Sequence, residues 1–217
     1  MPPDTTTIAA LREVLAADFP EARTVTRRCR EAGLIGSGKA GRGGVGSARV
    51  TSRDCRLLLI AASAPGAISA APAEALRIAG FRLRYLERTR ATEPHSLQFI
   101  DTPMTFIEFL IAQIDGIRGA VPDLDLVGWR ISRHQAMQRS PERLVFTGPE
   151  MPVYPDPRLE PVERSTAIPA RLIRDIAALF PALPPADHEP ALLAEVTALV
   201  KRGQSVRSAP QQRAAHG

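Results

Sequence analysis

The chain has 217 residues, of which 44% are apolar, so it can bury the core of one large domain or of two small ones. Its net charge is +5, and all but two of its 28 basic residues are arginine, a balance that favours an anionic partner. Because it lacks an N-terminal apolar segment and any apolar run of transmembrane length, we expect a soluble cytoplasmic protein without a membrane partner.

Two short helices are predicted at the start of the chain. Residues 5–17 carry apolar side chains at helical spacing, and Pro20 separates them from a second helix over 21–32. Gly33 is a typical residue for ending that helix. The predicted apolar stripe of the second helix consists of Ala22, Val25, Cys29 and Ala32.

The opposite side of the second helix is basic. Arg27 points directly away from the apolar stripe, with Arg23 and Arg30 beside it, because successive residues turn by roughly 100°. Such a face suits the major groove of DNA, where arginine recognises base edges. The candidate DNA-binding residues of this helix are Arg23, Thr24, Thr26, Arg27, Arg28 and Arg30.

A glycine-rich segment over 33–47 comes close to a phosphate-binding P-loop. Ala40 follows Lys39, where a P-loop needs a hydroxyl for Mg²⁺, and a helix rather than a strand precedes the segment. We therefore expect no nucleotide site. A β-hairpin wing that approaches the DNA backbone is the alternative, with Lys39, Arg42 and Arg49 as phosphate contacts.

A short strand at 48–51 and a third helix over 51–64 follow the glycine-rich segment. Thr51 and Asp54 have the spacing of a capping box, and the helix is apolar nearly all round from Leu57 onward, so it should be central to the core. Arg53 in its first turn completes the set of candidate DNA contacts. Residues 23–56 together carry nine basic and two acidic residues, a local charge of +7.

The order of these elements resembles the helix-turn-helix and wing of MerR-type and phage-like bacterial regulators. The similar segments are "EARTVTRRCREAGLI", a basic loop and "ARVTSRDCRLLLIA", within residues 5–64. Such regulators have a recognition helix that ends in arginine, an acidic residue, glycine and leucine, then a wing and a threonine-capped helix. The resemblance implies a winged helix-turn-helix that binds double-stranded DNA.

The rest of the chain predicts a mainly helical module with a small β-hairpin. The expected elements are a helix over 72–88, a short strand at 96–100, a helix over 102–119 capped by Thr102, strands at 124–132 and 143–148, a proline-rich connector over 149–161, and helices over 168–180 and 189–202. We therefore predict an α+β fold with a DNA-binding domain over 1–64, an oligomerisation or effector module over 72–202 and a disordered basic tail over 203–217.

No set of residues in the sequence predicts catalysis, a cofactor or a metal site. The four histidines are isolated, and neither Cys29 nor Cys55 belongs to a metal-binding motif. Both cysteines fall on apolar helix positions, so we expect buried free thiols. Trp129 is expected in the core.

These features predict a sequence-specific transcriptional regulator that is not an enzyme, acts on the nucleoid and forms a homo-oligomer, with a dimer favoured. The second module, over 72–202, would then contact the transcription machinery. Two alternatives remain open. One is a phage-like DNA-packaging subunit that uses the same helix-turn-helix, and the other is an adaptor whose basic face binds an acidic protein. Steep salt dependence would separate DNA binding from the adaptor, and oligomer size would separate a regulator from a packaging ring.

Overall fold

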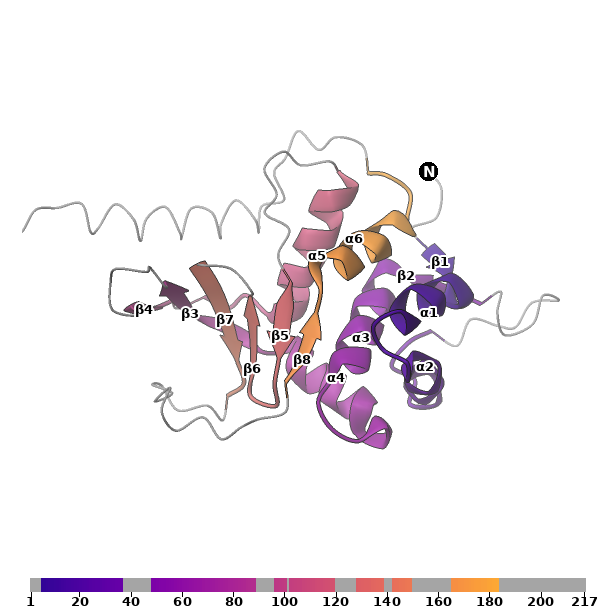
Figure 1. The fold of residues 1–217 in the computed structure, drawn as a ribbon, viewed down its shortest axis with the longest axis horizontal. Coiled ribbons are helices and arrows are strands. Elements are labelled where there is room, and N and C mark those ends of the chain that lie inside the picture. Colours follow the sequence, from indigo (N-terminus) through magenta and orange to yellow (C-terminus); the bar gives the residue numbers. More distant parts are fainter. Residues whose placement is uncertain are drawn as a thin grey trace, which may run out of the picture.

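The computed structural model describes residues 5–36, 48–88, 96–100, 102–119, 128–138, 142–149 and 165–183. Within these ranges the chain has the expected α+β class, with helices and two antiparallel sheets. A six-stranded sheet lies on one side, and the helices α1 (Ile8–Ala16) and α2 (Ala22–Glu31) lie on the other. Between them lie α3 (Ser52–Ser63), α4 (Ala71–Ala79) and α5 (Phe106–Arg118) (Figure 1).

The N-terminal part combines a two-stranded sheet with three helices. Its elements are β1 (Thr5–Thr7), α1 (Ile8–Ala16), α2 (Ala22–Glu31), β2 (Arg49–Thr51) and α3 (Ser52–Ser63), and β1 pairs with β2. The predicted first helix began three residues too early. Residues 5–7 are extended because they pair with β2, and the Thr7 side chain then caps α1, accepting from the Ala10 N–H at 3.2 Å.

Helix α3 is the centre of the fold, as its apolar sequence predicts. It contacts α1, α2, α4 and α5, and Leu58, Leu59 and Ile60 are fully buried. Its predicted capping box is present, because the Asp54 N–H donates to Thr51 Oγ1 at 3.1 Å and the Thr51 N–H donates to Asp54 Oδ2 at 3.2 Å.

The described residues from 68 onward build the larger sheet and three further α-helices. Its elements are a 3₁₀ turn, η2 (Ile68–Ala70), then α4 (Ala71–Ala79), β3 (Arg82–Arg88), β4 (Ser96–Phe99), α5 (Phe106–Arg118), β5 (Trp129–Ile131), β6 (Gln135–Gln138), β7 (Glu142–Thr147), β8 (Thr166–Ile168) and α6 (Ala170–Ala178). The strand order is β4-β3-β7-β6-β5-β8, with every pair antiparallel.

This sheet corrects the expectation of a helical module with a small hairpin. The predicted helix over 72–88 ends before Gly80, and its second half is strand β3. The apolar residues Leu83 and Leu86 fit a helical spacing, but they pair with Phe146 and Leu144 of β7 across a β-bulge. Strands β6 and β8 were not predicted at all, because neither has a clear alternation of apolar and polar residues.

Helix α5 begins later than expected. It lies in the interior of the fold because one of its faces is apolar. Thr105, not Thr102, is the N-cap, because Glu108 lies three residues after Thr105 and completes a capping box. Phe106 and Phe109 of α5 contact Trp129 at ring-centroid distances of 5.0 and 5.5 Å. Trp129 is fully buried, as predicted, and its indole N–H donates to Gln113 Oε1 at 3.1 Å.

The buried core does not break at the predicted boundary between residues 64 and 72. One cluster of buried apolar side chains includes Leu58 of α3, Ile78 of α4 and Phe106 of α5. The predicted helix over 189–202, the tail over 203–217 and nearly all of the proline-rich connector lie outside the described residues. None of the helices in the described ranges has the length and apolar character to cross a membrane.

Candidate nucleic-acid interface

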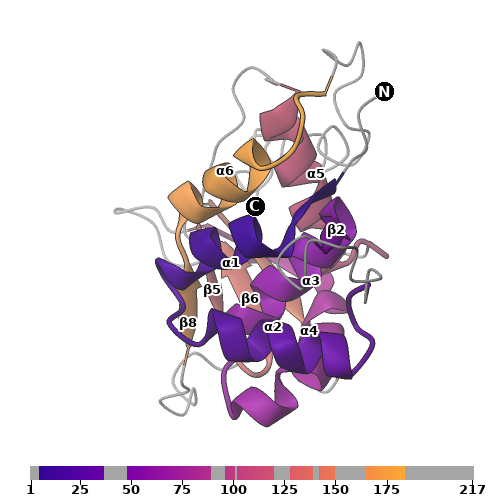
Figure 2. The ribbon, with the colours of Figure 1, turned by 90° about the vertical axis from the view of Figure 1, so that its right-hand side faces the viewer.

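Helix α2 carries the largest group of candidate DNA contacts and lies on the outer surface of the molecule, beside α1 (Figure 2). Ala22, Val25 and Cys29 are buried against the core, as predicted. Ala32 is exposed, because it follows the last helical residue as the C-cap. The fourth buried side chain of α2 is instead Thr26.

Thr26 is the one candidate on α2 whose side chain cannot reach a ligand. It is 2% exposed, and its hydroxyl donates to the Ala22 carbonyl at 2.7 Å. A threonine can turn its methyl group into a core when the hydroxyl bonds to the preceding helical turn. The buried stripe is therefore wider than predicted, and the outward face is centred between Arg27 and Thr24.

The remaining α2 candidates face solvent to different degrees. Arg23 is exposed, Thr24 is half-buried, and the Arg27 and Arg28 side chains are 64% and 48% exposed. Arg30 is half-buried, and within the described residues its Nε has no hydrogen-bond partner. Arg23, Arg27 and Arg28 are therefore the α2 arginines with the freest access to a partner.

Glu31, one of the two acidic residues counted within 23–56, places a negative charge on this basic face. Its carboxylate lies 3.8 Å from Arg27 Nε and 3.1 Å from Arg28 Nη1. These contacts span one helical turn, and all three side chains are exposed, so they add little to stability. They do lower the positive potential at the C-terminal end of α2.

The turn after α2 has the geometry that Gly33 predicts. Gly33 has φ +68°, its N–H donates to the Arg30 carbonyl at 3.0 Å, and the Leu34 N–H donates to the Cys29 carbonyl at 2.9 Å. This pair of hydrogen bonds is a Schellman motif, which satisfies the last carbonyls of a helix. Leu34 packs against the core and holds the end of α2 in place.

The other candidate contacts lie within the glycine-rich segment or after it. Arg49 of β2 is exposed, and its guanidinium donates to Thr5 Oγ1 of β1 at 2.9 Å. Arg53 is exposed in the first turn of α3. Lys39 and Arg42, with most of the predicted wing, lie outside the described residues.

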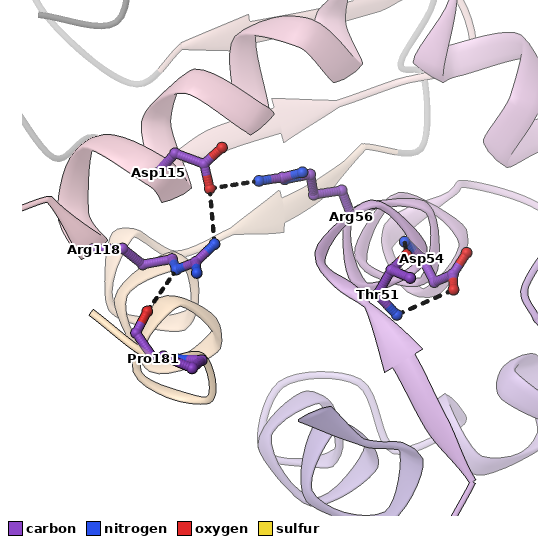
Figure 3. Close-up of polar contacts among 6 residues, drawn as sticks. All are labelled: Thr51, Asp54, Arg56, Asp115, Arg118 and Pro181. Atoms are coloured by element: carbon purple, nitrogen blue, oxygen red, sulfur yellow. Dashed lines mark hydrogen bonds and ion pairs between the residues drawn. The ribbon is translucent and has the colours of Figure 1, made fainter. Parts of the chain in front are cut away.

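Arg56 lies within the basic segment 23–56 of the sequence, but its side chain is buried and is not part of the basic surface. Its side chain is 4% exposed, and it donates to Asp115 Oδ1 of α5 at 2.8 Å (Figure 3). The same Asp115 oxygen lies 3.2 Å from the buried Arg118, which also donates to the Pro181 carbonyl. Arg56 therefore joins α3 to α5 and does not face a partner. Its position between Cys55 and Leu57, in an apolar run, is the sequence signal for this burial.

The cysteines of the described residues are buried, and no metal-holding cluster lies within the described ranges. Cys29 and Cys55 are buried free thiols, as predicted, and burial raises the pKa of the Cys29 thiol to about 11, which keeps it protonated and unreactive at neutral pH. Within the described ranges, no three His, Cys, Asp or Glu side chains gather to hold a metal ion.

Comparison of the chain with known protein families, with curated proteins and with solved structures found no match. The function must therefore be argued from the residues themselves.

Proposed function

We propose that the chain binds double-stranded DNA, with α2 as the recognition helix of a helix-turn-helix, and that it acts as a transcriptional regulator. The observation that carries the proposal is the composition of α2. Four of its ten residues are arginines, its buried stripe is apolar apart from Thr26, and its end is fixed by the Schellman turn at Gly33. A helix of this length spans about 15 Å and fits the major groove.

The neighbouring elements support the same function. Strand β2 holds the exposed Arg49 close to the N-terminal strand, and α3 presents Arg53 from its capped first turn. These arginines are suited to phosphate contacts, which position a protein on the duplex. Lys39 and Arg42 would add further phosphate contacts if the glycine-rich segment forms a wing. We propose a homodimer on the nucleoid as the acting form, because helix-turn-helix proteins commonly read two half-sites.

The test compares Arg27→Gln, Arg49→Gln and a control, Arg174→Gln, which removes an exposed arginine of α6. A target duplex is first selected from random sequences with the unaltered protein. Target and random duplexes are then titrated at several salt concentrations. We expect Arg27→Gln to weaken target binding about tenfold more than random binding, since a base contact contributes roughly 1–3 kcal/mol of discrimination.

Arg49→Gln should weaken both duplexes alike and lower the salt slope by about one, and Arg174→Gln should change neither. If no target can be selected and all four proteins bind random DNA equally, α2 is not a recognition helix. A dimer should give twice the mass of the chain in sedimentation equilibrium, whereas a large ring would favour a packaging subunit.

A further inference from the structure

A groove lies where the end of α2, the first half of α3 and the start of α4 meet. Its volume is about 800 Å³, and its apolar lining includes Leu34, Leu57, Pro72 and Leu76. Helices α2 and α4 both contact α3 and each other, so the walls of the groove are helices that pack against one another. None of the candidate α2 arginines lines it, which separates it from the proposed recognition face.

Leu76 is a large apolar side chain of the groove that the core of this protein does not bury. It lies on α4 but is 59% exposed, because α4 buries Ala75 and Ile78 instead. In the part of the chain that the structure describes, only Leu76 and Phe99 are large apolar side chains exposed to this extent. A groove with apolar lining residues that ends in an exposed leucine can receive the apolar face of a partner segment.

The charge of the groove favours an acidic partner. Arg53 lines the groove, is exposed and forms no ion pair with any described residue. The other charged lining residue is Asp54, whose carboxylate is held in the capping box and faces the positive end of the α3 dipole. Arg53 is therefore the charge that remains available to a partner.

We infer that this groove binds a short acidic amphipathic segment of another protein, with an apolar anchor side chain beside Leu76 and a carboxylate on Arg53. The side chains of Leu34, Pro72 and Leu76 offer no donor to a phosphate backbone, so the apolar part of this surface does not suit DNA. A small molecule would be expected to be enclosed on most sides, whereas Leu76 leaves the rim open. This inference does not depend on base recognition by α2, but the groove shares Arg53 with the proposed phosphate contacts, so a peptide and a DNA duplex would compete for that residue.

The test is a selection from a displayed library of random 14-residue peptides against the full chain, with counter-selection on Leu76→Gln. We expect enriched peptides in which Leu, Ile or Phe is flanked by Asp or Glu. Their affinity, measured by fluorescence anisotropy, should fall about tenfold on Leu76→Gln and about tenfold on Arg53→Gln. It should be unchanged by the control Arg174→Gln and should weaken with salt.

Several results would overturn the inference. They are the absence of any enriched peptide, enrichment of basic peptides, and peptides that bind Leu76→Gln as tightly as the unaltered protein. If a random DNA duplex displaced the bound peptide, and if the Leu76→Gln variant no longer bound that duplex, the groove would be a nucleic-acid site. Because Leu76 is exposed, Leu76→Gln should leave the melting temperature unchanged, and a fall of several degrees would mean that the chain itself fills the groove.

Discussion

The guanidinium of Arg56 donates to the carboxylate of Asp115 at 2.8 Å, which ties the central helix α3 to α5 (Figure 3). The two residues lie 59 positions apart in sequence. Arg118 shares the same carboxylate, so one acidic group serves two buried arginines. This relationship places the candidate DNA-binding helices on the same rigid core as the six-stranded sheet.

Asp115→Asn should therefore be destabilising. It removes a carboxylate shared by two buried guanidinium groups, and because the Asp115 side chain is 31% exposed, the cost should lie below the about 3–5 kcal/mol of a fully buried ion pair. Arg56→Met removes one charge and keeps an apolar side chain of similar length, so its cost should be smaller. Urea unfolding would measure both, with the exposed Asp175→Asn of α6 as the control. Equal stability of Asp115→Asn and the unaltered protein would show that solvent replaces the pair.

The continuous core predicts that the chain unfolds in one cooperative step. Leu58 and its neighbours on α3 contact elements on both sides of the boundary predicted near residue 70, so neither half can bury its apolar surface alone. A fragment of residues 1–70 should be unfolded by circular dichroism. Two resolved transitions in urea, or a folded fragment, would instead support separate domains.

Glu31→Gln should increase affinity for any DNA duplex if α2 faces DNA. Glu31 lies beside Arg27 and Arg28 and would repel phosphates, and removing one exposed charge at such distances is worth about 0.5–1 kcal/mol in water. The expected gain is about two- to fivefold at low salt, with no change in the preference for a target. Titration of target and random duplexes checks this, and Asp175→Asn serves as the control. Unchanged affinity would place the DNA elsewhere.

Gly33→Ala should destabilise the protein by about 1 kcal/mol. The cost arises from the backbone, because φ is +68° at this position while a Cβ there would meet no atom within 4 Å. Gly33→Asn should cost less, since asparagine tolerates this conformation better. Thermal unfolding of both variants measures the difference. If alanine and asparagine were equally costly, the left-handed conformation would not be the cause.

Stability should fall as the pH rises from about 9 to about 11 because of Cys29. Burial raises the pKa of this thiol from 9.0 to about 11, so in that window the unfolded thiol ionises while the folded thiol keeps its proton. Each pH unit then lowers the free energy of unfolding by up to about 1.4 kcal/mol, whereas below pH 9 this thiol has no effect. Urea unfolding of the unaltered protein and Cys29→Ala at several pH values isolates the contribution. Parallel pH curves for the two proteins would contradict it.

The sequence by itself determined the features that depend on neighbouring residues. The end of α2 at Gly33 and the capping box of Thr51 and Asp54 are hydrogen-bonded within a single turn, so their spacing is visible in the chain. The outward position of Arg23 and Arg27 follows from helical periodicity. The candidate recognition face could therefore be outlined from the sequence, apart from Thr26, whose burial depends on a hydroxyl bonding to its own helix.

Only the tertiary structure decided the features that join distant residues. Strand β3 was mistaken for helix because the spacing of Leu83 and Leu86 fits the helical period. Pairing with β7 about sixty residues later, with a β-bulge between Leu83 and Tyr85, makes this segment a strand instead. Strand β8 exists because residues 166–168 pair with β5. Arg56 is buried and does not lie on the basic surface for the same reason, since its partner Asp115 lies on another helix. Local spacing carries no information about such partners, whereas burial and pairing across the fold set their final positions.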